Sequence, residues 1–137
     1  MILVDTPVWS FALRRHPVNL SPSEQRLTRT LYELVLQNRV QLLGSTRQEV
    51  LSGIREESVF RRIRDYLRDF PNVELGATDY EEAARITNDC RRAGIAGDPV
   101  NMLMCAVSIR REWQILTTDR DFVHYARVVP LSLLRPH

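Results

Sequence analysis

Lysine is absent from this chain of 137 residues, and all 19 of its basic residues are arginine. Without lysine, the sequence contains no P-loop, no Schiff-base site and no cation to pair with an acyl phosphate. A net charge of +2 does not by itself indicate nucleic-acid binding. Arginine pairs around an acidic cleft would nevertheless suit a phosphodiester backbone. The arginines do cluster, in Arg14-Arg15, Arg61-Arg62-x-Arg64, Arg91-Arg92 and Arg110-Arg111.

Cysteine and histidine are scarce, with two of the first and three of the second. Cys90 and Cys105 both fall in helix-like segments, and we expect them to be reduced core thiols rather than a disulfide. The histidines at 16, 124 and 137 have no zinc-ligand spacing. No G-x-S-x-G nucleophile elbow is present either. These absences argue against a zinc site and against a hydrolase built on such an elbow.

Long apolar runs are also missing, since none reaches the length needed to span a membrane. Met1 leads directly into the short run "ILV", whereas a signal peptide needs a basic start and a longer apolar stretch. We therefore expect a cytoplasmic protein without membrane association. The length predicts a single domain over residues 1–137, and the 44% hydrophobic and 26% charged fractions are ordinary for a globular protein.

Apolar segments alternate with amphipathic ones along the chain. We predict helices after "ILVD", from "SPSE" to about Asn38, and over "TDYEEAARITNDCRRAG", with a Thr78/Glu81 capping box and a stop at Gly94. Strands are predicted at "ILVD", "VQLLGS", "NVELG", "QILTT" and "RVVPLSLL", the last at an edge because of Pro130. This alternation predicts an α/β fold, with a mostly parallel sheet covered on both faces.

Acidic residues stand where predicted strands end, which is where ligands bind in such sheets. Asp5 follows the first strand, and Thr6-Pro7 already looks like a cap followed by the first helical proline, which leaves Asp5 free. Asp119 follows "QILTT", and Asp121 comes two residues later. One of the two is needed to cap the short helix that follows. Asp119, nearer the strand, is the better candidate for chemistry, and Asp121 is the better candidate for the cap or for a supporting residue beside the site.

Two further candidates have competing interpretations. Glu49 lies three residues after Thr46, as in a capping box, so this residue alone leaves capping and function equally open. Asp98-Pro99 fits an N-cap and a first helical proline, which makes Asn101 the third helical residue. Asn101 either bonds locally, faces solvent, or serves as a site ligand. Clustered carboxylates need a counter-ion, and Mg²⁺ or Mn²⁺ suits oxygen ligands without His or Cys.

Three segments together carry a family resemblance: "MILVDTPVWSFAL", "STRQEVLSGI" and "MLMCAVSIRREWQILTTDRDF". They resemble the signature regions of PIN-domain ribonucleases, and most of all the VapC-like toxins of type II toxin–antitoxin pairs. Their order and spacing, from residue 1 to about 134, are more specific than any one of them. The resemblance implies a three-layer α/β/α fold and a Mg²⁺-dependent endoribonuclease acting on RNA. It also implies a cognate antitoxin whose tail blocks the active site, and a homodimer.

The four acids of the family fall on Asp5, Glu49, position 101 and Asp119. The resemblance makes Asp5, Asn101 and Asp119 the expected metal ligands, with Asp98, Asp121, Thr6 and Thr117 as supporting residues around them. The family has Asp where this chain has Asn101, which keeps an oxygen but loses a charge. With an effective dielectric constant near 20, a unit charge about 4 Å away is worth roughly 4 kcal/mol. Metal affinity should therefore drop substantially.

Three explanations for Asn101 are open, and we rank them in this order. The asparagine is an engineered inactivation, or a natural variant with weakened or lost activity, or Asp98 supplies the missing charge from one turn earlier. The last ranks lowest because an N-cap directs its carboxylate at backbone amides.

Other functional classes fit less well. A phosphoacceptor receiver needs a lysine, and an aspartate-nucleophile phosphatase needs an acid where Pro7 stands. The main alternative is a catalytically dead PIN-fold module that docks an antitoxin or RNA. Trp9, Phe11 and Leu13 would then form a partner-binding surface, although core packing is their simpler interpretation.

Overall fold

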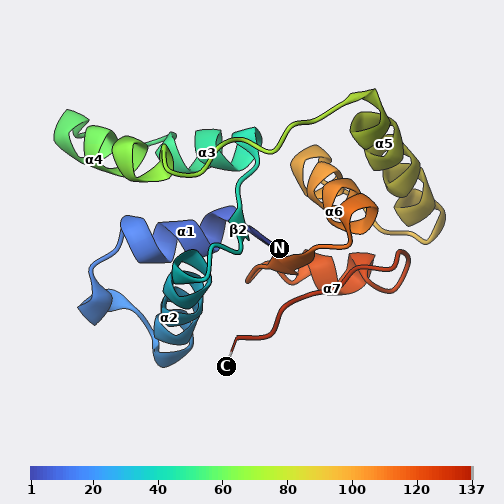
Figure 1. The fold of residues 1–137 in the computed structure, drawn as a ribbon. Helices are drawn as coiled ribbons and strands as arrows, with labels where there is room; N and C mark the ends of the chain where they lie inside the picture. Colours follow the sequence, from blue (N-terminus) through green and yellow to red (C-terminus); the bar gives the residue numbers. More distant parts are fainter. Residues whose placement is uncertain (137) are drawn as a thin grey trace.

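The computed structural model describes residues 1–136 of the chain. In this part, three parallel strands form one sheet in the order β2-β1-β3, with β1 (Ile2–Val4) at its centre between β2 (Val40–Gln41) and β3 (Gln114–Leu116). Parallel neighbours require long crossover connections, and helices supply them (Figure 1). The predicted parallel α/β fold is confirmed.

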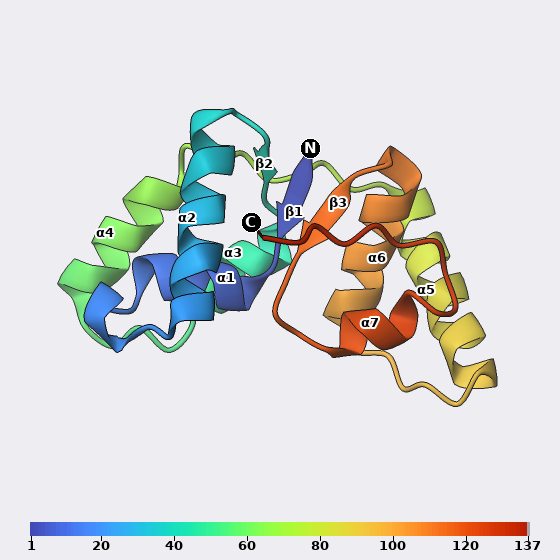
Figure 2. The same cartoon turned by 90° about the horizontal axis from the view of Figure 1, so that it is seen from below.

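The crossovers place helices on both faces of the sheet. Figure 2 shows α1, α2 and α4 on one side and α5, α6 and α7 on the other. This is the expected three-layer α/β/α arrangement. No helix within residues 1–136 is long and apolar enough to cross a membrane. The helices are α1 (Thr6–Leu13), α2 (Pro22–Leu36), α3 (Gly44–Leu51), α4 (Glu57–Leu67), α5 (Ala77–Arg92), α6 (Pro99–Arg111) and α7 (Asp121–Tyr125), with a 3-10 turn at Pro17–Asn19.

Two hydrophobic cores lie on opposite faces of the sheet, because side chains alternate along a strand. Ile2 and Val4 enter the core that α1, α2 and α4 cover, whereas Leu3 enters the core beneath α5 and α6. Both cores include residues of the strands, so the ends of β1 and β3 are fixed in position by buried packing on both faces of the sheet.

Trp9 is fully buried in the first core, and its Nε1–H donates to the Val4 carbonyl at 3.2 Å. Phe11 and Leu13 are partly buried against the same core. The core-packing interpretation of these three residues is therefore confirmed. The Trp9 hydrogen bond connects α1 to the end of β1, and this contact fixes the direction in which the chain leaves the strand.

Helix boundaries follow the local signals in part. Ser21 and Glu24 form a complete capping box at the start of α2, and Gly94, at φ +79°, follows the end of α5 as predicted. The predicted Thr78/Glu81 box is wrong: α5 begins after Gly76, whose N–H donates to Asp79 at 3.0 Å. Asp79 is also the residue that two arginines of α6 bind, so its position sets the helix start.

Two predicted strands are reduced to single bridges. "NVELG" contributes only the bridge from Asn72 to Leu42, because the carbonyl of Glu74 accepts a hydrogen bond from an arginine side chain rather than from a strand. "RVVPLSLL" contributes only the bridge from Leu133 to Ile115, which has two backbone hydrogen bonds. Prolines at 130 and 136 lack the N–H needed to extend this pairing.

Candidate active site

Asp5 lies at the carboxyl end of the central strand and is only 6% exposed. Its Oδ1 accepts the Thr6 N–H at 2.8 Å, and its Oδ2 accepts the Thr117 hydroxyl at 2.7 Å. Asp5 is therefore the N-cap of α1, and Thr6 is its first helical residue. The expectation that Thr6 is the cap and Asp5 is spare was wrong. The extended backbone of Asp5 turns its carboxylate back over the helix start, which also directs it to the sheet edge.

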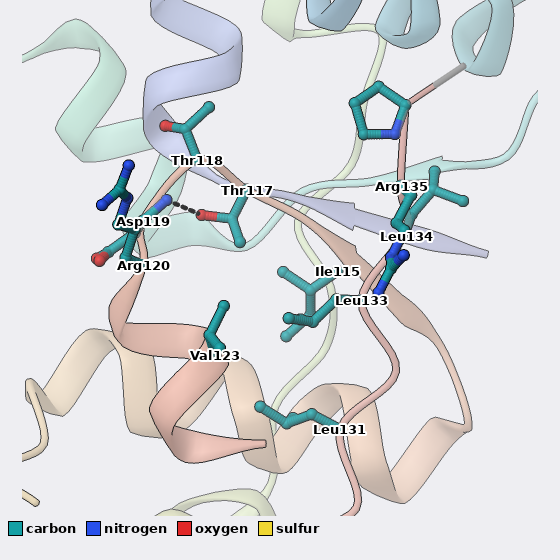
Figure 3. A pocket seen from close by; sticks show the side chains of 11 residues that line it. Ile115, Thr117, Thr118, Asp119, Arg120, Val123, Leu131, Leu133, Leu134 and Arg135 are labelled. Atoms are coloured by element: carbon teal, nitrogen blue, oxygen red, sulfur yellow. Dashed lines mark hydrogen bonds between the residues drawn. The ribbon is translucent and has the colours of Figure 1, made fainter. Parts of the chain in front are cut away.

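Asp119 reaches the same edge from the end of β3. Its backbone N–H donates to the Thr117 hydroxyl oxygen at 3.0 Å, a bond drawn in Figure 3. The Thr117 hydroxyl thus connects Asp5 to the Asp119 backbone, since it donates to one and accepts from the other. Asp119 Oδ1 accepts the Asp121 N–H at 2.9 Å. The N-cap residue of α7 is Arg120, which makes no side-chain cap bond, and Asp119 accepts the N–H of the first helical residue, so the assignment of the cap to Asp121 was wrong.

Asn101 is the third residue of α6, as predicted, because Asp98 caps the helix with bonds to the N–H groups of Val100 and Asn101. Its Nδ2 donates to Asp119 Oδ2 at 3.3 Å. Both oxygens of Asp119 are therefore engaged by protein donors. The carboxylate of Asp98 faces backbone amides, which agrees with ranking its substitution for the missing charge last.

Tyr125 lies beneath this group of residues. Its side chain is buried and its hydroxyl has no hydrogen bond of standard geometry within residues 1–136. Burial raises the pKa of Tyr125, and the neighbouring Asn101 side chain partly offsets that rise. Asn101 therefore lies between the buried Tyr125 hydroxyl and the Asp119 carboxylate. A negative charge added at position 101 would have the Tyr125 hydroxyl as a donor and would be repelled by Asp119.

Glu49 comes to the site from α3. Its Oε2 accepts the Thr6 hydroxyl at 3.0 Å, across 43 residues of sequence. No capping box forms, because α3 begins after Leu43 and the Thr46 hydroxyl is buried without a partner within the described part of the chain. The capping interpretation of Glu49 was therefore wrong. Its carboxylate is exposed and faces the start of α1 instead.

The electrostatics of the site are set by Asp5. Burial is the largest cause of a raised pKa at this carboxyl, and the negative charges of Asp119 and Glu49 raise it further. Hydrogen bonds from Thr117 and Thr6 oppose the shift. Like charges around a desolvated carboxylate favour the arrival of a proton or a cation. Such an arrangement occurs more often at functional sites than in ordinary packing.

The donor set fits a hard divalent cation in kind, because Asp5, Asp119, Glu49 and Asn101 offer only oxygen ligands. The repulsion that raises the pKa of Asp5 is also what such an ion would relieve. Within residues 1–136, however, no three side chains of His, Cys, Asp or Glu stand close enough to hold one ion. Threonine hydroxyls and the Asn101 amide bridge the carboxylates instead.

The arginine pair 110–111 does not line the acidic cleft. Arg110 and Arg111 both bind Asp79, and Arg111 also donates to the Glu74 carbonyl at 3.0 Å. They stand at the C-terminal end of α6, about 15 Å along the helix axis from Asn101. No signal in the sequence indicates this pairing, because no spacing rule connects positions 79 and 110.

The comparisons with known proteins agree with this fold. The PIN domain family model matches residues 2–128. FitAcB from Neisseria gonorrhoeae is similar with a TM-score of 0.74 at 19% identity, over 99% of this chain and 98% of that one. VapBC2 from Rickettsia felis, bound to a promoter DNA fragment, has a TM-score of 0.74 at 16% identity, over 98% of both chains. FitAB bound to an IR36 DNA fragment has a TM-score of 0.72 at 17% identity, over 98% of this chain and 94% of that one.

No curated protein sequence matches the chain. The structural likenesses, all below 20% identity, bear on the fold, whereas the family match covers nearly the whole sequence. Strand order, the helices on both faces and the acidic residues at the sheet edge agree with that match. The chain belongs to the PIN-domain family.

Proposed function

We propose that this protein is a metal-dependent endoribonuclease toxin of the VapC-like kind. The observation that carries the proposal is the buried carboxylate of Asp5, linked through Thr117 to Asp119 and surrounded by like charge. A stable fold gains nothing from such repulsion, so a cationic ligand is its simplest explanation. PIN-family membership makes nuclease chemistry the matching activity.

Asp5, Asp119 and the amide oxygen of Asn101 would hold Mg²⁺ or Mn²⁺. When bound, the ion would supply charge neutralisation for a phosphodiester and a water of lowered pKa. Holding this site in place is the task of Thr117, which fixes Asp5 relative to the Asp119 backbone. Glu49 is exposed beside the site and would accept the proton of the attacking water.

A hollow of about 380 Å³, lined mostly by residues with polar side chains, includes Glu49 and supports the binding of an RNA segment. Thr6 and Val100 line it together with the hydroxyl and amide groups of Ser45, Gln48 and Ser52. Groups of this kind bind phosphate and ribose without selecting a base. An RNA backbone in this hollow would pass directly over the Glu49 carboxylate.

We also propose a cognate antitoxin and a homodimer, as the VapC-like resemblance implies. The names VapBC2 and FitAB each join two components, which supports a protein partner for this chain as well. Such a partner would block the acidic edge when bound and release it when lost.

The test of this function is Mg²⁺-dependent cleavage of a structured RNA by the chain as given and by Asn101→Asp. We expect slow or absent cleavage with Asn101 and clear cleavage by the variant, abolished by a chelator. Asn101→Asp combined with Asp5→Asn serves as the inactive control. Equal cleavage by the unchanged chain and by Asn101→Asp would remove position 101 from the metal site. Cleavage that survives Asp5→Asn would contradict the proposed site as a whole.

A second candidate is a catalytically dead binding module that docks an antitoxin or RNA. One contact favours it: the Asn101 amide satisfies Asp119 without any ion. Calorimetry with Mn²⁺ on Asn101→Asp separates the two candidates. Heat of binding supports the nuclease, whereas its absence with aspartate restored at position 101 supports the module.

A further inference from the structure

A second hollow adjoins the acidic site at Asp119. It has a volume of about 490 Å³ and lies between the loop after β3 and the C-terminal segment (Figure 3). Thr117, Thr118 and Asp119 form its end at the site. In Figure 3, Arg120 lies beside Asp119 at this end, Val123 lies below them, and Leu133 and Arg135 lie across the hollow on the C-terminal segment.

The walls of this hollow are aliphatic, and its opening is basic. Val123 is 51% exposed although it is a large apolar residue, so its side chain is available to a ligand. Arg120 and Arg135 also line the hollow. Both are exposed, and within residues 1–136 neither has a carboxylate within 4.0 Å. Asp119, at the inner end, is the one acidic residue that lines it.

We infer that this hollow binds one nucleotide of the RNA, next to the bond that is cut. This inference rests on the proposed ribonuclease function and deepens it. The base packs on Val123, Leu131 and Leu133, and the phosphate on the far side of that nucleotide lies at Arg135. The order along the hollow is therefore acidic site, apolar wall, cation. A nucleic-acid strand presents the matching order: reacting phosphate, base, next phosphate.

Size and charge together favour a nucleotide over other occupants. A volume of about 490 Å³ lies within the range of small-ligand sites and is sufficient for a single nucleotide. An apolar side chain of a partner protein would fit the walls but would leave both guanidinium groups without an anion. A phosphate alone would fit the arginines but would leave the apolar walls uncovered.

The first experiment uses methyl NMR with the four nucleoside 5′-monophosphates as probes, and inorganic phosphate as the anion control. We expect the methyl signals of Val123, Leu131 and Leu133 to shift with nucleotides and not with phosphate. Val123→Trp fills the hollow and should weaken nucleotide binding about tenfold, equivalent to roughly 1.4 kcal/mol. Val18→Trp is the matched control, because Val18 is 78% exposed in the turn before α2.

The second experiment changes the charge and does not depend on repacking. Arg135→Glu should weaken nucleotide binding several-fold, with a smaller effect at high salt. Arg127→Glu makes the same change at an exposed arginine that does not line the hollow, and should leave binding unchanged. Equal effects of the two variants would overturn the inference.

The remaining outcomes separate this inference from the ribonuclease proposal. If Asn101→Asp cleaves RNA and Val123→Trp in that background leaves KM and the base preference at the cut unchanged, the nucleotide site is wrong and the ribonuclease stands. If nucleotides shift the methyl signals but no variant cleaves RNA, the site stands and the activity is wrong. Methyl shifts with inorganic phosphate alone, or with none of the probes, would also refute the nucleotide site.

Discussion

Asp79 and Asp5 are both buried aspartates, yet their surroundings are opposite. Asp79 is 1% exposed and binds Arg110, Arg111 and the Gly76 N–H, so the paired guanidinium groups hold its pKa far below the usual range. Asp5 is 6% exposed and has hydroxyl and amide donors but no cation, so burial raises its pKa. The fold pairs the first carboxylate with two arginines and leaves the second without a cation, among other acids.

This contrast separates a structural charge from a functional one. Asp79 connects the start of α5 with the end of α6, the two helices that share the most extensive packing in the molecule. Breaking such a pair leaves a charge without its partner. Asp5 accepts hydrogen bonds from the Thr6 N–H and the Thr117 hydroxyl, and neither of these neutral donors balances a negative charge. Its charge therefore has to be explained by something that binds from outside.

The largest difference between the Asp5 site and the Asp79 cluster is expected when a negative charge is added at the Asp5 site. Asn101→Asp should raise the affinity for Mn²⁺ about a hundredfold, because a unit charge next to the ion is worth a few kcal/mol. Calorimetric titration measures this directly. Asn88→Asp makes the same change at an exposed position on α5 and should leave Mn²⁺ affinity unchanged. Similar gains in both variants would show that nonspecific charge, and not the site, binds the ion.

Removing the charge at Asp79 should have the opposite consequence, a loss of stability without a loss of metal binding. Asp79→Asn should lower the free energy of unfolding by about 2 kcal/mol, since two guanidinium groups lose their partner. Urea denaturation measures the change. Asp65→Asn, at an exposed ion pair with Arg64, should cost less than about 0.5 kcal/mol. If both variants cost the same, the Asp79 cluster is not a structural anchor.

Much of the fold could be predicted from the sequence, because periodicity and local caps are local properties. The strand "ILV", the capping box at Ser21 and the Asp98 cap all appear where the pattern predicts them. The short bridges at residues 72 and 133 could not be predicted in the same way. Their length depends on competing partners far along the chain, such as the arginine that binds the Glu74 carbonyl.

The candidate site was likewise predictable from the sequence only in part. The position of Asp5 and Asp119 at strand ends follows from the parallel sheet, and the structure places both there. Their hydrogen bonds were assigned wrongly, because several residues near each helix start are able to cap it. Which one does so is decided by tertiary partners: the Thr117 hydroxyl binds Asp5, and the Thr6 hydroxyl binds the Glu49 side chain, which therefore caps no helix. No rule of sequence spacing contains these contacts.

The two aspartates should also differ in how stability depends on pH. Since the pKa of Asp5 is raised, the folded state binds more protons than the unfolded state between 3.8 and that raised pKa. The contribution of Asp5 to the free energy of unfolding therefore falls as pH rises through that window. Asp79 behaves oppositely: its contribution is fully present above 3.8 and is lost only as pH falls through its lowered pKa.

Asp5→Asn should remove the Asp5 part of this dependence and raise stability near pH 7 by roughly 1 kcal/mol, because a buried charge among like charges is removed. Urea denaturation at a series of pH values between about 3.5 and 7 measures it. RNA cleavage in the Asn101→Asp background should be lost at the same time. An unchanged slope against pH would mean that Asp5 is not the source of the repulsion.

The smallest effect is expected at Thr6, whose hydroxyl donates to the exposed Glu49 carboxylate. Thr6→Val keeps the shape of the side chain and should change stability by less than about 0.5 kcal/mol, because the bond is exposed to water. Cleavage in the Asn101→Asp background should fall a few-fold, since Glu49 loses the contact that orients it. Thr28→Val removes a comparable hydroxyl contact on α2 and should leave cleavage unchanged. A loss of stability without a change in kcat would show that the Thr6 hydroxyl stabilises the fold, as Asp79 does, and has no part in cleavage. Glu49 would then not be one of the reacting groups.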